Sequence, residues 1–211
     1  MEKADYNIAS VTKALQLIDL LSRKNGQLSV QALAEKLDVS PSNVTRLLQT
    51  MRDSGFVEKS PKTNRYLLNN KFYVVTSNML YSNECIQKYL PVAQRVAAKL
   101  NATVALNSLY GKNAVMLARA GGLYRSEDFS VGNLRPAYCS SAGKVMLSTL
   151  SEQQMAVFWE GLEFEQFQSN TIMDAGRLCR ELEQIKRDGY AVDREERYIG
   201  LVSVSFALTE F

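Results

Sequence analysis

Two short amphipathic segments separated by a tight turn form the clearest pattern in the first third of the chain. In the first segment, three apolar positions recur at helical spacing: Leu33, Ala34 and Leu37. Ser29 stands just before them, where its hydroxyl can accept a hydrogen bond from a free amide of the first turn. The pattern predicts a short helix, followed by a turn at Asp38-Val39.

The second segment is predicted to begin at Ser40-Pro41, because a serine N-cap followed by proline suits a helix start, and to end near Gly55. Its inward positions are Val44, Leu47, Leu48 and Met51. Its polar face carries Ser42, Asn43, Thr45, Arg46 and Gln49. Short hydrogen-bonding residues beside one arginine are typical of a helix that reads the DNA major groove.

A basic turn, Ser60–Asn64, follows between the apolar pairs Phe56-Val57 and Tyr66–Leu68. This pattern predicts the wing of a winged helix-turn-helix. Candidate phosphate contacts from this region are Lys59, Lys62 and Arg65. The other interpretation is a small helical domain with a solvated basic face, but the cap, turn, inward pattern, glycine and wing occur in order, which favours DNA binding.

An earlier helix, capped by Ser10, is predicted to pack behind the recognition helix. Its inward positions would be Val11, Ala14, Leu15, Ile18 and Leu21. After the wing, helices are predicted over residues 71–83 and from residue 86 or 91 to residue 100. The first of these has Phe72, Val75 and Met79 on one side, and two interpretations stay open for it: a connector that forms a dimer surface, or ordinary core packing.

From residue 103 the hydrophobic period changes. Strands are predicted over 103–110 and 114–120, joined by a hairpin at Gly111-Lys112-Asn113, and later over 190–192 and 201–208. Helices are predicted over 142–149, 152–159 and 175–188. The chain is therefore predicted to be α+β, with a substantially antiparallel sheet in its second domain.

Composition changes the picture in three respects. The net charge is +3, and all of it falls in residues 1–70, which hold ten Lys/Arg against seven Asp/Glu; a local basic surface supplies salt-sensitive DNA affinity. There is no histidine, and three widely spaced cysteines fit reduced thiols, so neither a metal site, a cofactor nor a disulfide framework is expected. No long apolar run or signal core is present, so we expect a cytoplasmic protein, nucleoid-associated when bound to DNA, without membrane contact.

Two stretches of the second domain carry candidate chemistry. Ser140 and Ser141 precede a helix whose free amides, beside Lys144, could attract a small anion such as a carboxylate. Asp193, after a predicted strand, could accept hydrogen bonds from a hydroxylated ligand. The ordinary interpretations are a helix cap and a solvated acidic loop.

The spacing from Ser141 to Lys144 also matches the Ser-x-x-Lys nucleophile of penicillin-binding enzymes. The Lys-Thr-Gly and Ser-Asp-Asn motifs that accompany it there are absent from the sequence, and Tyr138 stands where a P-loop would need its first glycine. An enzyme is therefore not expected.

Three segments together resemble the IclR family of bacterial transcription regulators: 38–68, 135–150 and 185–207. The resemblance implies a winged helix-turn-helix at 1–70, a linker helix at 71–84, and a GAF-like or profilin-like effector domain at 85–211. It also implies a homodimer or homotetramer that binds double-stranded operator DNA and a small-molecule effector. Operator contacts would come from Ser40, Pro41, Ser42, Asn43, Thr45 and Arg46.

The resemblance places the effector site at Ser140, Ser141, Ala142, Gly143, Asp193 and Ser203. Family members usually have proline where Ala207 stands, and they continue beyond the last residue here, so we expect an effector domain that is incomplete at its C-terminus. The amide-rich turn opposite Asp193 favours a sugar acid or hydroxy acid as the effector of a repressor. A member that dimerises and binds DNA without sensing a ligand is the alternative.

Overall fold

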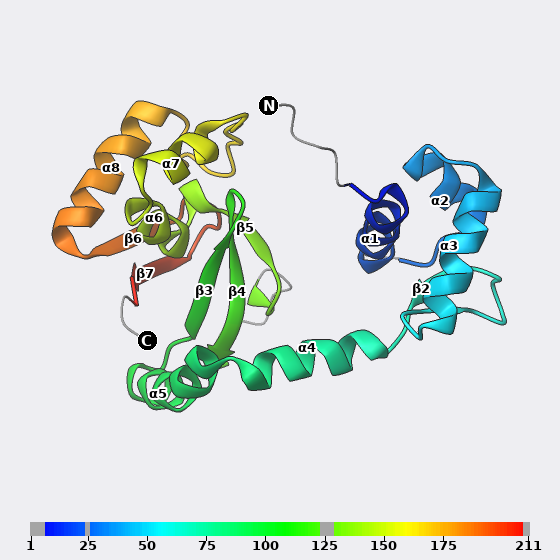
Figure 1. Cartoon of the computed structure of the whole chain (residues 1–211). Helices are drawn as coiled ribbons and strands as arrows, with labels where there is room; N and C mark the ends of the chain where they lie inside the picture. Colours follow the sequence, from blue (N-terminus) through cyan, green and yellow to red (C-terminus); the bar gives the residue numbers. More distant parts are fainter. Residues whose placement is uncertain (1–6, 24–25, 123–128, 209–211) are drawn as a thin grey trace. The chain divides into compact units, whose positions relative to one another are not determined.

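The computed structural model describes residues 7–23, 26–122 and 129–208, and it divides into two compact units, Met1–Ser82 and Asn83–Phe211 (Figure 1). Each unit contains both helices and strands, so the predicted α+β class is confirmed. Within these described ranges, none of the helices is long and apolar enough to cross a membrane.

The first unit is a winged helix-turn-helix. Its elements are α1 (Ala9–Ser22), α2 (Val30–Leu37), α3 (Pro41–Asp53), β1 (Val57–Lys59), β2 (Tyr66–Leu68) and α4 (Lys71–Ser82). Ser29 caps α2 as predicted, since its hydroxyl accepts from the amide of Ala32 at 3.2 Å. Asp38 then adopts a left-handed conformation with φ 51°, which turns the chain into α3.

Strands β1 and β2 pair antiparallel, and an isolated bridge between Leu28 and Tyr66 ties the strand pair to the segment before α2. The core of the unit consists of Leu17, Leu21, Leu33, Ala34, Leu37, Val44, Leu48, Met51, Val57 and Tyr66. Burial of these side chains is the main term that holds the two helices and the wing together.

The prediction for α1 is wrong in two details. The helix begins at Ala9 after Ile8, without a side-chain cap, so Ser10 lies inside it. Val11 and Leu15 are 52% and 58% exposed, while Leu17 is fully buried. Apolar residues occur on more than one face of this helix, and the helical period alone does not show which face meets the core.

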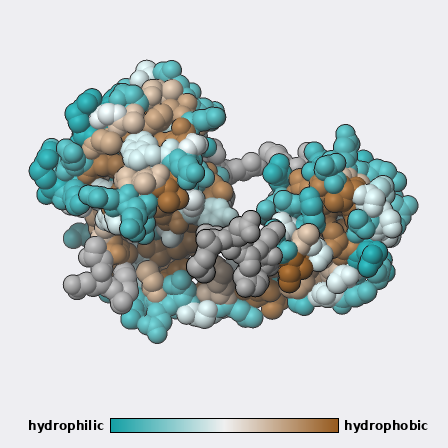
Figure 2. Space-filling view, turned by 45° about the horizontal axis from the view of Figure 1, so that its top comes forward, coloured by the Kyte–Doolittle hydropathy of each residue, from teal (hydrophilic) through white to brown (hydrophobic). Residues whose placement is uncertain are grey.

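Helix α4 has no buried residue. Its start is fixed to the unit by Phe72, whose ring lies 5.2 Å from that of Phe56 in an edge-on arrangement, and by Lys71, whose ammonium donates to the carbonyl oxygen of Ser54 at 2.7 Å. Its exposed apolar side chains are Tyr73, Val74, Val75, Met79 and Tyr81. Figure 2 shows brown apolar atoms at the surface among teal polar ones on the face in view.

The second unit holds the remaining elements: α5 (Glu84–Leu100), β3 (Val104–Tyr110), β4 (Asn113–Ala120), β5 (Leu134–Pro136), the 3-10 turn η2 (Ala137–Cys139), α6 (Ser141–Ser148), α7 (Glu152–Trp159), α8 (Ala175–Asp188), β6 (Tyr190–Arg194) and β7 (Val202–Phe206). Helix α5 starts earlier than predicted, because Asn83 caps it by accepting from the amide of Ile86 at 3.0 Å, and it continues through Pro91.

The strands form two antiparallel groups, β3-β4-β5 and β6-β7. The β3–β4 register shifts between Leu106 and Asn107, which pair with Ala118 and Met116. Ala118 and Met116 lie on the same face of β4, so this β-bulge pairs two successive residues of β3 with one face of β4. In a regular pair, successive residues would alternate between the two faces. As a result, Asn107 faces the same side of the sheet as Ala114 and Met116.

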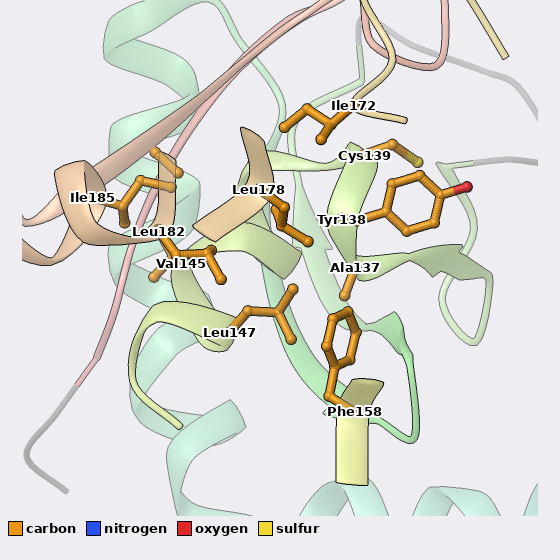
Figure 3. Close-up of a cluster of buried hydrophobic side chains, with 11 residues drawn as sticks. Ala137, Tyr138, Cys139, Val145, Leu147, Phe158, Ile172, Leu178, Leu182 and Ile185 are labelled. Atoms are coloured by element: carbon orange, nitrogen blue, oxygen red, sulfur yellow. The ribbon is translucent and has the colours of Figure 1, made fainter. Parts of the chain in front are cut away.

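The core of the second unit gathers around η2, α6 and α8 (Figure 3). Its buried side chains are Ala137, Tyr138, Cys139, Val145, Leu147, Phe158, Ile172, Leu178, Leu182, Ile185 and Ala191. The hydroxyl of Tyr138 is satisfied at the edge of this core, where it donates to the carbonyl oxygen of Glu165 at 2.9 Å. Helix α6 packs against α8, β6 and β7, so its first residues lie in the interior of the unit.

Candidate DNA-binding surface and effector site

The N-terminal half of α3 presents an exposed polar face. Ser40 accepts from the amide of Asn43 at 3.3 Å, and Pro41 occupies the first helical position. The predicted contact residues Ser42, Asn43, Thr45 and Arg46 are all exposed. Thr45 donates its hydroxyl hydrogen to the carbonyl oxygen of Pro41 at 2.8 Å, which leaves its oxygen available as an acceptor. The structure brings these residues onto one side of α3.

The wing exposes its cations. Lys59, Lys62 and Arg65 are exposed, and Asn64 takes a left-handed φ of 56° at the turn. The ammonium of Lys59 lies 5.7 Å from the centre of the Tyr66 ring. None of these three cations forms an ion pair with another described residue, so their charges remain available to an anionic partner.

The start of α6 contrasts with that of α3, because it is buried. Ser140 caps the helix by accepting from the amide of Gly143 at 3.2 Å. The Ser141 hydroxyl lies 2.7 Å from that of Ser203 and 2.8 Å from that of Ser205. Four predicted effector residues are therefore joined in two pairs, Ser140 with Gly143 and Ser141 with Ser203, while Ala142 is half-buried.

Gly143 is required by close packing. A Cβ atom at this position would lie 2.2 Å from the carbonyl oxygen of Ala137 and 2.4 Å from its Cα. Both atoms belong to the backbone, which cannot rotate out of the way as a side chain can. The close packing of α6 against η2 thus explains the glycine of the Gly-Lys pair.

Lys144 is fully buried, and its ammonium donates to the carboxylates of Glu181 and Glu196 and, at 2.9 Å, to the carbonyl oxygen of Val192. An ammonium has three hydrogens, and these three acceptors use all of them. Lys144 can therefore neither attract the anion expected at this helix nor activate Ser141 as a base.

Asp193 is also buried, and its carboxylate accepts from the amide of Glu196 at 2.9 Å. Burial raises the pKa of Asp193, while this hydrogen bond and the cations Lys144 and Arg135 act in the opposite direction. Burial likewise raises the pKa of Glu196, whose Oε2 has no hydrogen-bond partner. The predicted acidic residue thus belongs to a buried, charged interior.

Two further residues that the sequence did not reveal lie on the sheet. Arg135 of β5 is 9% exposed, and its Nη2 donates to Oδ1 of Asn107 at 2.9 Å. The partners meet because the bulge turns Asn107 toward this face. No spacing rule connects residues 28 positions apart across a three-stranded sheet.

The cysteines are free thiols in three different surroundings: Cys85 is half-buried, Cys139 is buried and Cys179 is exposed. Burial raises the pKa of Cys139 to about 12. In the part of the chain that the structure describes, no cluster of three or more Cys, Asp or Glu side chains could hold a metal ion.

Comparison with known proteins matches both units to family models. The model described as "Bacterial transcriptional regulator IclR C-terminal" matches residues 77–210, which is more than half of the chain. The chain belongs to the IclR family. The model described as "IclR helix-turn-helix domain" matches residues 10–61.

Among curated relatives, the HTH-type transcriptional regulator XynR of Escherichia coli is 26% identical over 94% of this chain and 79% of its own length. KdgR of the same organism is 24% identical over 95% of this chain and 76% of its own. These IclR-family relatives are named as transcriptional regulators, so this chain is a DNA-binding transcriptional regulator and not a Ser-Lys hydrolase.

Solved structures agree. An IclR transcriptional regulator from Alicyclobacillus acidocaldarius is 27% identical with a TM-score of 0.78, and the match covers 94% of this chain and 81% of that one. An IclR homologue from Microbacterium hydrocarbonoxydans, solved with 4-hydroxybenzoate, has a TM-score of 0.79 at 14% identity, covering 95% of this chain and 83% of that one; it shares the fold.

Proposed function

We propose that this IclR-family regulator is a repressor that reads its operator with the N-terminal half of α3 and contacts the flanking DNA backbone with the wing. The observation that carries this proposal is the exposed polar face of α3. Arg46 would contact a base edge or a phosphate, and Ser40, Pro41, Ser42, Asn43 and Thr45 would complete the contact. Lys59, Lys62 and Arg65 would contact phosphates without reading sequence.

The test is a titration of the full chain onto its own upstream DNA and onto a scrambled duplex at two salt concentrations. Tighter binding to the upstream DNA that persists at the higher salt is expected, because base contacts are less salt-sensitive than phosphate contacts. Arg46→Ala should weaken this binding by about ten-fold or more. Arg187→Ala, which removes an exposed arginine from α8, is the matched control. Equal, salt-labile binding to both duplexes would contradict the proposal.

A repressor of this kind works as a homodimer or homotetramer on DNA in the bacterial cytoplasm, and is nucleoid-associated while bound. The exposed apolar side chains of α4 support self-association, because Val75 and Met79 are one helical turn apart and 47% and 63% exposed. Val75→Asp should lower the sedimenting mass. Ser77→Asp, which adds the same charge on the side of α4 away from Val75 and Met79, should leave it unchanged if these two side chains lie in the interface.

We also propose that a small acid, such as a sugar acid or hydroxy acid, binds the second unit at Ser140, Ser141, Ala142, Gly143, Asp193 and Ser203 and changes operator affinity. The support is the family membership and the interior position of polar residues that a purely apolar core would not contain. A coupling of about 1–3 kcal/mol between the two sites is typical of such regulators.

One observation favours a second candidate, in which the unit dimerises without sensing. The hydroxyls of Ser141, Ser203 and Ser205 already satisfy one another, and Lys144 has no donor left. Thermal unfolding separates the candidates, because a ligand that binds the folded state raises Tm with its concentration. A Tm unaffected by any acid would support the second candidate.

A further inference from the structure

The Arg135 side chain is a buried cation with an incomplete set of partners. Its guanidinium has five N–H donors, and among the described residues it has one acceptor, the Asn107 amide oxygen. Its Nε is buried without a hydrogen-bond partner. Across residues 7–23, 26–122 and 129–208, no carboxylate forms an ion pair with it. Buried charges in proteins are normally paired and hydrogen-bonded, so this arrangement points to an anion.

An aromatic ring and several charged side chains surround the guanidinium. The Phe129 ring lies 5.5 Å from the guanidinium carbon. Burial lowers the pKa of Arg135, while Tyr198 and Asp193 favour its charged form and the second cation, Arg197, opposes it. The Asp193 carboxylate accepts from the amide of Glu196 and forms no ion pair with Arg135 among the described residues, so its effect on the guanidinium is purely one of charge.

The strand register and the β-bulge together determine the surroundings of Arg135. Arg135 stands opposite Ala114 in the β4–β5 register, and Ala114 is fully buried with no side chain beyond Cβ. The β-bulge then places Asn107 on the same face, where it accepts from Nη2. A neutral acceptor orients the guanidinium and leaves its charge uncompensated, whereas an aspartate there would have neutralised it.

From these observations we infer that Arg135, oriented by Asn107, binds the carboxylate of the effector and thereby selects acids over neutral analogues. A planar guanidinium matches a carboxylate with two parallel N–H···O bonds, which an ammonium such as Lys144 cannot make. The inference rests on the proposed effector site and differs from it in where the anion is held: on the sheet, and not at the start of α6.

The test uses the full chain and three acid–amide pairs: lactate and lactamide, gluconate and gluconamide, 4-hydroxybenzoate and 4-hydroxybenzamide. Tm and calorimetric affinity are measured for wild type, Arg135→Met, Asn107→Asp and the exposed-site control Arg187→Met. We expect at least one acid, and not its amide, to raise the Tm of wild type and of the control. Arg135→Met should lower the affinity for that acid at least ten-fold.

Asn107→Asp keeps the arginine and supplies an internal carboxylate. It should also lose acid binding while its Tm without ligand rises, a combination that a merely structural role for Arg135 would not produce. The variant also keeps the test decisive if Arg135→Met fails to fold. Binding of acid and amide with equal affinity, wild-type affinity in Arg135→Met or Asn107→Asp, or no binding of any of the three acids would each overturn the inference.

Operator affinity measured on the same samples without acid separates the two proposals. Unchanged operator binding with no acid effect would contradict the role of Arg135 and leave DNA recognition intact. If the wild-type chain does not bind operator DNA, the proposed function is contradicted, whether or not an acid raises Tm.

Discussion

Helices α3 and α6 begin in the same way chemically and in opposite surroundings. In each, a serine hydroxyl accepts from the amide three residues on, at 3.3 Å for Ser40 and 3.2 Å for Ser140. Ser40 is exposed, whereas Ser140 is 4% exposed and is followed by a glycine packed on backbone and a fully buried lysine. A capped helix start can serve as a binding surface only where the fold leaves it exposed to solvent. Substitutions at matched positions of α3 and α6 should show this difference in unfolding free energy and DNA affinity.

The largest expected difference is at Lys144. Lys144→Met would leave the Glu181 and Glu196 carboxylates without their cation and should lower the free energy of unfolding by about 3–5 kcal/mol. Lys186→Met, at an exposed position of α8, should change it by less than about 0.5 kcal/mol. Chemical denaturation of both variants is the measurement.

The Lys144→Met loss should depend on pH in a defined direction. Burial already raises the pKa of Glu196 above its ordinary 4.5, and removal of the ammonium raises it further. Between the unfolded and folded values the folded state binds more protons, so the free energy of unfolding falls as pH rises. As the pH falls toward the ordinary 4.5, the variant should regain stability relative to wild type; a gap that widens on acidification would contradict this assignment.

The next largest effect on unfolding free energy is expected at a glycine of α6, which we compare with a glycine of α8. Gly143→Ala meets backbone atoms at 2.2 Å and should cost about 3 kcal/mol. In α8, a Cβ at Gly176 would meet the side-chain atom Oδ1 of Asp174 at 3.3 Å, and alanine is the better helix former, so Gly176→Ala should be neutral or stabilising by up to about 1 kcal/mol. Thermal unfolding of the two variants side by side tests this; equal effects would mean that α6 can move away from η2.

The two caps themselves should differ by less. Ser40→Ala should cost about 1 kcal/mol, the usual value of an exposed N-cap. Ser140→Ala should cost about 2 kcal/mol, because the Gly143 amide would stay buried without an acceptor. Denaturant titration of both variants measures the difference, and a larger loss for Ser40 would reverse the comparison.

The smallest effect on stability is expected at the wing, and there the quantity to measure is DNA affinity. Lys62→Ala should leave Tm unchanged, since Lys62 is exposed, and should weaken binding to all duplexes alike. The slope of log affinity against log salt should fall in magnitude by about one. A variant that changed sequence preference would place Lys62 at a base edge instead of a phosphate.

These contrasts show what the sequence could predict. Helices α7 and α8 have the predicted bounds because each is marked by local chemistry: Ser151 and Gln154 form a capping box, and Asp174 and Gly189 begin and end α8. The winged helix-turn-helix was predictable for the same reason, because its caps, turn and glycine lie close together along the chain.

Features that depend on contacts distant in sequence were not predictable. The exposure of Val11 is decided by which side of α1 meets the core, and the depth of Lys144 by the packing of α6 against α8 and β6. The pairing of Asn107 with Arg135 needs a register shift that no residue pattern announces. Periodicity gives the apolar faces of an element, and tertiary packing selects among them.

The three thiols differ in exposure, so their labelling rates can report local unfolding of the second unit. Thiolate is the reactive form, so an alkylating reagent should modify the exposed Cys179 first and the half-buried Cys85 more slowly. Cys139, fully buried and with a pKa of about 12, should react only when the core around η2 opens. Its labelling rate therefore reports the opening free energy of the second unit, and the same sample can show whether a bound acid closes that unit more tightly.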